Sequence, residues 1–162
     1  MRNKGIFIAI EGPIGAGKTT LANLLNEHLG YTLLREIVEE NPFLSKFYTD
    51  IKEYALQTEA FFLFNRVKQL EDVNKNILSK SNGVVSDYHI VKNLIFAGIT
   101  LDNNQFHRYK QVYNIFVNDL PQPDIVIYLN SNTDTLMKRI ASRDRSFERQ
   151  MDRNYIDNLR NE

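Results

Sequence analysis

The chain has 162 residues, a length typical of one domain, and 43% of them are hydrophobic, which is enough for a core. Lys and Arg together number 20, as do Asp and Glu, so the chain lacks the basic character of a general nucleic-acid binder. The absence of cysteine excludes disulfides, thiolate metal sites and a thiol nucleophile. The N-terminal apolar run is too short for a signal peptide or a membrane span, so we expect a cytoplasmic protein.

Strands are predicted to alternate with helices along the whole chain. In chain order, the predicted elements are a strand at 5–10, a helix at 19–29, a strand at 31–37, a short helix after Pro42, a long helix at 51–79, a strand at 83–90, helices at 90–98 and 103–119, a strand at 124–129, a helix at 133–142 and a last helix toward Glu162. Residues 143–150 are expected to form an exposed polar loop. The alternation predicts an α/β fold with a parallel sheet covered on both faces.

The stretch GPIGAGKTT directly follows the first predicted strand and matches the phosphate-binding pattern G-x-x-x-x-G-K-[ST]. Glycines allow backbone N–H groups to point at phosphate oxygens, and the following helix adds its positive N-terminal end. Lys18 is predicted to reach the β- and γ-phosphates of ATP, and the Thr19 hydroxyl to bind Mg²⁺. The predicted ATP contacts in this loop are Gly12, Pro13, Ile14, Gly15, Ala16, Gly17, Lys18, Thr19 and Thr20.

Three polar or loop-forming residues fall at or just past the ends of predicted strands, namely Gly12, Glu36 and Asp87. Ligands of parallel sheets bind beyond the carboxyl ends of the strands. We therefore expect these three separate segments to deliver their groups to one edge of the sheet.

Two charged residues interrupt an apolar stripe on the long predicted helix. The stripe consists of Ala55, Leu56, Glu59, Phe62, Leu63, Arg66, Val67 and Leu70. Glu59 and Arg66 are about 10 Å apart along the helix axis, too far for an i,i+4 ion pair, so each is expected to have another partner. Either a polar ligand lies against this helix, or the stripe reaches the surface and both charged heads extend into water.

The segments GPIGAGKTT, REIVEENPFLSKFY, QTEAFFLFNRVKQLED and SDYHIVKNLIFAG, in this order, resemble the bacterial deoxynucleoside kinases, in particular the deoxyguanosine kinase branch of the deoxyadenosine/deoxyguanosine kinases. The resemblance covers essentially the whole chain. It implies a three-layer P-loop kinase fold, ATP and Mg²⁺ as cofactors, 5′-phosphorylation of a deoxynucleoside and a homodimer. Relatives usually continue with a fifth strand and a further helix, so residues 1–162 are interpreted as a single kinase domain truncated at its C-terminus.

The resemblance also implies roles for individual residues. Glu36 matches the general base that accepts the proton of the 5′-hydroxyl, and its neighbours Glu39 and Glu40 are the alternatives for this role. Tyr48 matches the residue that binds the 3′-hydroxyl, and Glu148 matches its carboxylate partner from the lid.

The base of the nucleoside is expected to lie against the long helix. Glu59 falls where many relatives have a glutamine that recognises the base, and Arg66 matches a nearby arginine on the same helix. Phe62 and Asn93 complete the predicted nucleoside site. An ionised carboxylate only accepts hydrogen bonds, and guanine offers two adjacent donors, N1–H and N2–H₂. Adenine and cytosine would present an acceptor instead, so Glu59 favours deoxyguanosine.

Asp87 matches an acidic residue expected near Mg²⁺, with a helix N-cap as the alternative. Relatives have an arginine at the position of Tyr88, so the positive charge near the 5′-oxygen is expected to come from elsewhere, with Lys92 or the lid as the options. His89 lies in the same motif and is assigned no chemistry.

The lid is predicted at residues 142–150. Arg139, Arg143 and Arg145 match arginines that contact the transferring phosphates, and with Lys18 they are expected to neutralise the γ-phosphoryl group. Relatives have glycine at the position of Asp144, a departure that bears on the backbone geometry of the lid.

Other functions remain open at this stage. A deoxyadenosine kinase or a broader deoxynucleoside kinase is the nearest alternative. A nucleoside monophosphate kinase has a similar loop and lid but should bind an acceptor phosphate with basic residues, where this chain has acidic ones. The third alternative is a regulator that binds nucleotides without catalysing a reaction. A GTPase is disfavoured, because no Asn-Lys-x-Asp motif is present.

Overall fold

The computed structural model describes residues 4–149 and 151–161 and is built on a parallel sheet with the strand order β2-β3-β1-β4. The strands are β1 (Phe7–Glu11), β2 (Thr32–Leu34), β3 (Val84–Ser86) and β4 (Ile125–Tyr128). The helices are α1 (Lys18–Leu29), α2 (Leu44–Phe47), α3 (Ile51–Asn76), α4 (Lys92–Thr100), α5 (Asn103–Val117), α6 (Thr133–Arg143) and α7 (Arg153–Asn161). The predicted α/β fold with a parallel sheet is confirmed.

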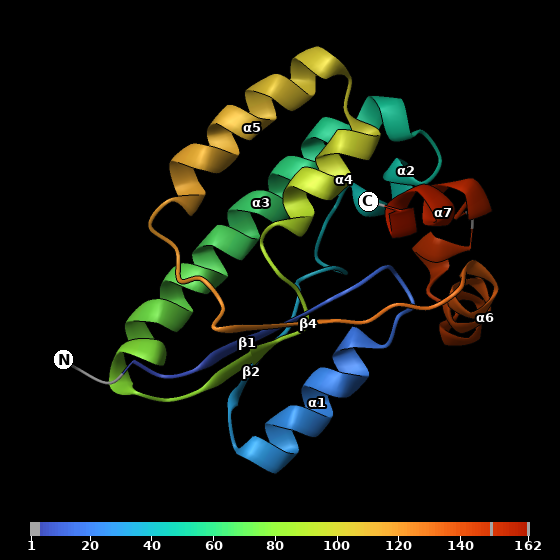
Figure 1. Cartoon of the computed structure of the whole chain (residues 1–162). Coiled ribbons are helices and arrows are strands. Elements are labelled where there is room, and N and C mark those ends of the chain that lie inside the picture. Colours follow the sequence, from blue (N-terminus) through green and yellow to red (C-terminus); the bar gives the residue numbers. More distant parts are fainter. Residues whose placement is uncertain (1–3, 150, 162) are drawn as a thin grey trace.

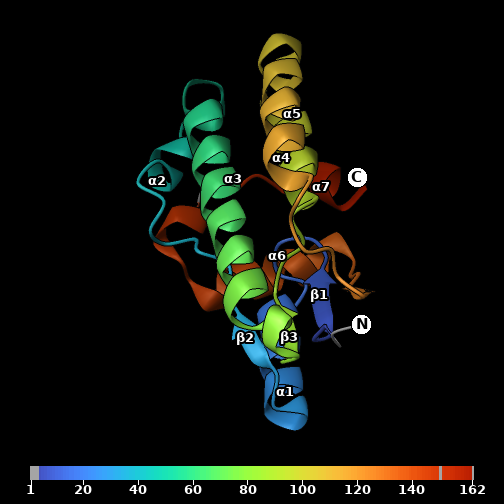
Figure 2. The ribbon, with the colours of Figure 1, turned by 90° about the vertical axis from the view of Figure 1, so that its left-hand side faces the viewer.

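Helices lie on both sides of the sheet, with α1 on one side and α3, α4 and α5 on the other (Figures 1 and 2). The alternation of side chains along β1 explains the two layers, because successive residues of a strand point to opposite faces. Phe7 and Ala9 pack in a cluster with α3 residues such as Leu63, whereas Ile8 and Ile10 pack in a second cluster with Ala22 of α1.

The carboxyl ends of the strands meet at one edge, and α6 and α7 lie beyond it (Figure 1). β2 ends at Leu34 and β3 at Ser86, so both are shorter than predicted, and Glu36 and Asp87 follow them directly in the loops. α1 ends at Gly30, which has the left-handed conformation expected of a C-cap glycine (φ 67°). The long helix ends at Asn76, and a separate 3₁₀ turn follows it at Leu78–Lys80.

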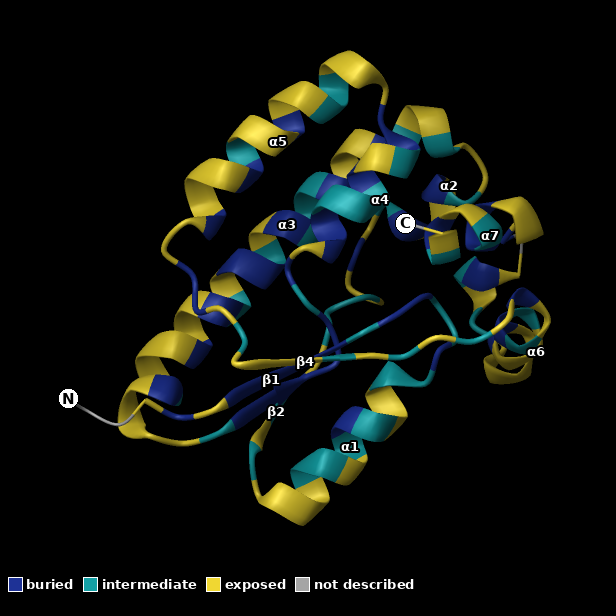
Figure 3. Ribbon diagram, viewed as in Figure 1, coloured by how far each residue is buried: buried dark blue, intermediate teal, exposed yellow. Residues whose placement is uncertain are grey.

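Three sequence-based predictions of burial are wrong. Leu56 was assigned to the apolar stripe of α3 but is 41% exposed, because it lies at the solvent-facing margin of the helix. β4 is an edge strand that pairs with β1, and its apolar residues are largely exposed (Figure 3). Residues 143–150 are not a uniformly exposed loop: Ser146–Glu148 form a 3₁₀ turn and Glu148 is buried, while Gln150 lies outside the described residues.

Within the two described ranges, none of the helices combines the length and the apolar character that a bilayer span requires.

We predict that Leu63→Ala lowers the free energy of unfolding by about 2–5 kcal/mol, because a large side chain that is only 1% exposed leaves a cavity in the main core. Leu56→Ala on the same helix is the matched control, and we expect it to change stability by less than about 1 kcal/mol. Urea unfolding of both variants measures the difference. Equal losses would contradict the assignment of the buried face of α3.

Candidate active site

A cavity of about 950 Å³ opens at the carboxyl edge of the sheet. Its wall combines the phosphate loop, the loops after β2 and β3, the middle of α3, the start of α4 and the segment after α6. Most predicted site residues line it: Ile14, Gly15, Ala16, Gly17, Lys18, Thr19, Thr20, Glu36, Tyr48, Glu59, Phe62, Arg66, Asp87, Arg139, Arg143, Arg145 and Glu148. Gly12, Pro13 and Asn93 are buried behind the wall.

The phosphate loop has the backbone that its glycines predict. Gly15 and Gly17 have φ values of 84° and 98°, in the region that side chains rarely adopt. The Lys18 ammonium lies across the loop and donates to the carbonyls of Gly12 (2.6 Å) and Pro13 (3.0 Å). Burial, and next the charge of Lys92, lower the pKa of Lys18 to about 8. The loop therefore contributes two things to the cavity wall: the largely desolvated ammonium group of Lys18 and glycine backbone in a positive-φ conformation.

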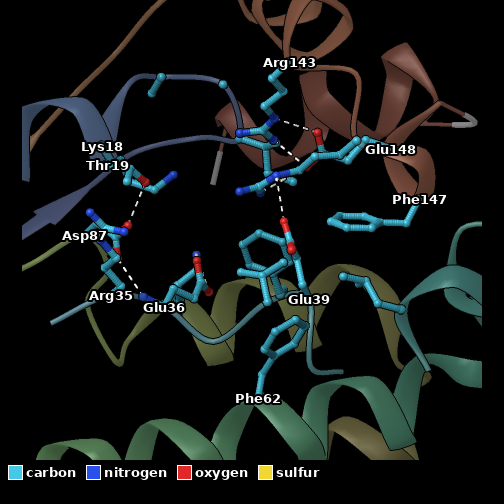
Figure 4. Close-up of a pocket in the computed structure, with 18 of the residues that line it drawn as sticks. Lys18, Thr19, Arg35, Glu36, Glu39, Phe62, Asp87, Arg143, Phe147 and Glu148 are labelled. Carbon is cyan, nitrogen blue, oxygen red and sulfur yellow. Dashed lines mark hydrogen bonds and ion pairs between the residues drawn. The ribbon is translucent and has the colours of Figure 1, made fainter. Parts of the chain in front are cut away.

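Asp87 connects two segments of the site. Its carboxylate accepts a hydrogen bond from the Thr19 hydroxyl (2.7 Å) and another from the backbone N–H of Glu36 (2.8 Å), as Figure 4 shows for the Thr19 side. The alternative of a helix N-cap is wrong, because α4 begins only at Lys92. Within the described part of the chain no cluster of three or more His, Cys, Asp or Glu side chains could hold a metal. The candidate metal ligands here are thus one carboxylate and one hydroxyl.

The Glu36 carboxylate is held by two buried cations. Arg66 donates to its Oε1 atom, and the Lys92 ammonium lies 3.0 Å from both carboxylate oxygens. Burial works to raise the pKa of Glu36, but Lys92, Arg66 and Lys18 together hold it well below its usual range. The alternative Glu39 is 71% exposed in its side chain and lies at the rim beside Arg145 (Figure 4).

Glu59 and Arg66 are 2% and 4% exposed, so the interpretation that both extend into water is wrong. Glu59 Oε1 accepts from the Thr100 hydroxyl (3.1 Å), whereas Oε2 has no partner within the described residues. Burial raises the pKa of Glu59 to about 7, against the lowering effect of Arg66 and the Thr100 hydrogen bond. Arg66 likewise keeps an unpartnered Nε–H among these residues.

Asn93 positions the Arg66 side chain through hydrogen bonds. It accepts from an Arg66 N–H (2.7 Å) and donates to the Tyr109 hydroxyl (2.9 Å), which in turn donates to the backbone carbonyl of Glu59 (3.2 Å). The chain of hydrogen bonds ties α3, α4 and α5 together. It also fixes the guanidinium at the orientation in which it meets Glu36.

Aromatic rings form the part of the wall nearest α7. Tyr48 stacks parallel to Phe147 with ring centres 6.5 Å apart, and Phe47 and Tyr155 meet it edge-on at 5.0 and 6.4 Å. Burial, and next the charge of Glu148, raise the pKa of Tyr48. Tyr48 and Glu148 both line this aromatic part of the cavity.

The predicted lid arginines divide into two groups. Arg143 forms a two-pronged ion pair with Glu148 (2.6 and 2.5 Å), and Arg145 lies 3.8 Å from the same carboxylate (Figure 4). Arg139 instead donates to the carbonyls of Gly15 and Ala16 in the phosphate loop.

Asp144, at the position where the resemblance implied glycine, adopts the left-handed conformation (φ 45°) at the end of α6. Its carboxylate pairs with Arg149. Aspartate is one of the residues that tolerate this conformation, so the chain makes this turn without glycine.

Several residues of the site were not predicted. On the cavity wall, Lys92 was only one option for a cation, and Phe96 and Tyr155 were not assigned to the site. Thr100, the partner of Glu59, was not assigned either. Their partners are distant in sequence, so helical periodicity gave no signal for them. Phe147 was detectable in principle, because it is the single apolar residue in the polar stretch RDRSFERQ.

Comparison with known proteins gives one consistent result. The family model described as deoxynucleoside kinase matches residues 8–162. The chain is 49% identical to the deoxyguanosine kinase of Bacillus subtilis, over 97% of this chain and 76% of that protein, and 35% identical to the deoxyadenosine kinase of Lactobacillus acidophilus, over 87% and 68%. A solved structure of deoxyadenosine kinase from M. mycoides with bound dATP is 32% identical, with a TM-score of 0.85 over 96% of this chain and 80% of that one.

We predict that Arg66→Met destabilises the protein by about 1–3 kcal/mol, because it leaves the buried Asn93 without its donor, whereas Glu36 keeps Lys92 as a partner. Arg153→Met removes an exposed ion pair with Asp134 and serves as the control, for which we expect no comparable loss. Denaturant unfolding at neutral pH measures both. A loss for Arg66→Met no larger than for the control would show that the pair does not stabilise the fold.

Proposed function

The chain belongs to the deoxynucleoside kinase family, and we propose that it transfers the γ-phosphoryl group of ATP to the 5′-hydroxyl of deoxyguanosine. The observation that carries the guanine preference is the buried Glu59 carboxylate with an unpartnered oxygen on the cavity wall. The roles below are our proposals for how the residues of this cavity carry out the reaction.

On the donor side, the loop from Gly12 to Thr20 would hold the phosphates of ATP through its backbone N–H groups and Lys18. Arg139, Arg143 and Arg145 lie around the same end of the cavity and would neutralise phosphate charge. Phosphoryl transfer depends mainly on positioning and charge neutralisation, which a set of converging cations supplies.

Thr19 and Asp87 are our candidates for binding Mg²⁺. Hydroxyl and carboxylate oxygens suit this ion, which usually keeps several waters and takes few protein ligands, so a 2.7 Å hydroxyl–carboxylate pair beside the phosphate loop fits it. When bound, Mg²⁺ would offset the negative charge of the phosphates.

On the acceptor side, Glu36 would take the proton of the 5′-hydroxyl. Its low pKa makes it a weak base toward a neutral hydroxyl, so we infer that the proton moves late, after the bond to phosphorus has begun to form. Tyr48 and Glu148 would hold the 3′-hydroxyl, since both line the aromatic part of the cavity.

Guanine is the base that complements the polar atoms of Glu59 and Arg66 on the cavity wall. Its N1–H and N2–H₂ donors match an ionised Glu59, and its O6 acceptor matches the unpartnered Arg66 Nε–H. Phe62, whose ring lies 4.8 Å from the Arg66 guanidinium, would cover a face of the base.

We further propose that residues 1–162 act as one kinase domain, that residues 142–150 move as a lid and that the protein is a homodimer. Support for the homodimer comes from exposed apolar side chains on α3 and α5. Phe64 and Phe116 are 47% and 42% exposed and touch each other, and the neighbouring Ile115 is 73% exposed.

The proposed function is tested by steady-state turnover of ATP with the four deoxynucleosides and with deoxyguanosine monophosphate. We expect deoxyguanosine to have the highest kcat/KM. Turnover of the monophosphate alone would instead indicate a nucleoside monophosphate kinase, and no turnover of any acceptor would indicate a regulator.

We predict that Glu59→Gln lowers kcat/KM for deoxyguanosine by about 5- to 150-fold relative to deoxyadenosine. The amide presents a donor where guanine also has a donor, and such a mismatch costs about 1–3 kcal/mol. Glu53→Gln, an exposed position on the same helix, is the matched control. If the four deoxynucleosides keep the same order of kcat/KM in Glu59→Gln, Glu59 does not recognise the base.

The raised pKa of Glu59 predicts a preference that depends on pH. Ionised Glu59 accepts from guanine N1–H, whereas protonated Glu59 donates to adenine N1 and accepts from its amino group. The ratio of kcat/KM for deoxyguanosine to that for deoxyadenosine should therefore rise by about tenfold per pH unit between pH 6 and 8. The same ratio should be flat in Glu59→Gln, and a flat ratio in the wild-type protein would contradict the prediction.

A further inference from the structure

Lys92 is a buried cation on the cavity wall with a position that ion pairing alone does not require. It is the first residue of α4, its side chain is 7% exposed, and its ammonium lies 3.0 Å from each oxygen of Glu36. A buried lysine is expensive unless it is paired, and Glu36 already has a cationic partner in Arg66. The second cation therefore calls for a reason of its own.

The two cations on Glu36 are anchored differently. The Arg66 guanidinium also donates to Asn93 and lies over the rings of Phe62 (4.8 Å) and Tyr88 (5.7 Å). The Lys92 ammonium has hydrogen bonds to Glu36 alone among the described residues, and the Phe96 ring is 5.3 Å away. An ammonium has three N–H donors on a flexible stem. Arg66 thus fixes the carboxylate, whereas Lys92 has a spare donor and freedom to turn.

Lys92 also shares the cavity with the phosphate-loop cation. Lys18 and Lys92 both line the cavity, Lys18 from the start of α1 and Lys92 from the start of α4. Two ammonium groups in one desolvated cavity repel each other, and an anion placed between them relieves this repulsion. The two ammonium groups of Lys18 and Lys92 are therefore suited to bind a highly charged anion next to the Glu36 carboxylate.

We propose that Lys92 is a second catalytic cation, whose ammonium turns from Glu36 to the oxygens of the γ-phosphoryl group while that group is transferred. This inference rests on the proposed function. In the step, a bond forms between the 5′-oxygen and the γ-phosphorus, and the bond from this phosphorus to the bridging oxygen breaks, with its electron pair leaving on ADP. The hydroxyl proton passes to Glu36.

The movement of Lys92 would exchange one partner of its ammonium group for another. Before the transfer, its N–H groups meet the two oxygens of Glu36. During the transfer they would meet the oxygens of the phosphoryl group, while Arg66 continues to hold the Glu36 carboxylate.

The test compares Lys92→Met, Lys92→Arg and the exposed control Lys110→Met in the full chain. Lys92→Met leaves Glu36 paired with Arg66, so no buried charge loses its last partner. For each variant we would measure kcat at saturating ATP and saturating deoxyguanosine, or whichever deoxynucleoside the wild-type protein phosphorylates best, and KM for that nucleoside. Thermal unfolding and calorimetric binding of the deoxynucleoside are measured in parallel.

We expect Lys92→Met to lower kcat by about 10²–10³-fold, as for the loss of one group that stabilises transition-state charge, with KM for the nucleoside changed by far less. Lys92→Arg keeps the charge, so its kcat should exceed that of Lys92→Met.

Two outcomes would overturn the proposal. They are a kcat of Lys92→Met within threefold of Lys110→Met, and a kcat of Lys92→Arg no higher than that of Lys92→Met. If Lys92→Met does not fold, Lys92→Gln takes its place under the same two criteria. A wild-type protein that phosphorylates no deoxynucleoside would instead refute the proposed function, so the two failures are distinguishable.

Discussion

The buried ion pairs of Glu36 hold the site together, because they join three elements that are far apart in the sequence. Glu36 follows β2, Arg66 lies in the middle of α3 and Lys92 begins α4. Removing such charges from water costs several kcal/mol per ion, which only close pairing and further hydrogen bonds offset. The three elements are therefore held at one spacing.

The donor and acceptor halves of the cavity are connected through Asp87. One oxygen of its carboxylate accepts from Thr19 at the start of α1, and the other accepts from the backbone of Glu36. The phosphate loop and the proposed base are thus positioned by the same side chain. A displacement of β3 would move both together, so the distance between phosphoryl donor and hydroxyl acceptor is protected against small shifts of the sheet.

The sequence predicted the elements and the edge of the sheet because these depend on local patterns. The phosphate loop, the strand ends before Glu36 and Asp87, and the irregular charges in the α3 stripe are all visible within short windows. Predictions failed where burial depends on distant segments. Leu56 has apolar character but faces solvent, and Glu148 stands in a polar stretch but is buried against Arg143. Likewise, periodicity identified Glu59 and Arg66 as unusual but could not name Thr100, Asn93 or Glu36 as their partners.

The unpaired polar atoms of residues on the cavity wall indicate which hydrogen-bonding groups a ligand should have. Buried polar groups in folded proteins are nearly always hydrogen-bonded, so unsatisfied ones concentrated in one place need an explanation. Six buried side-chain atoms have no partner within the described residues. Four of them, Glu59 Oε2, Arg66 Nε, Thr58 Oγ1 and Tyr155 Oη, belong to residues that line the same cavity, whereas His89 Nε2 and Arg160 Nε belong to residues that do not. A ligand that complements these atoms regains hydrogen bonds that the protein has already desolvated, whereas an analogue that mismatches them leaves them unpaired. Discrimination between bases can thus arise from the desolvation of the cavity wall and requires no movement of the protein.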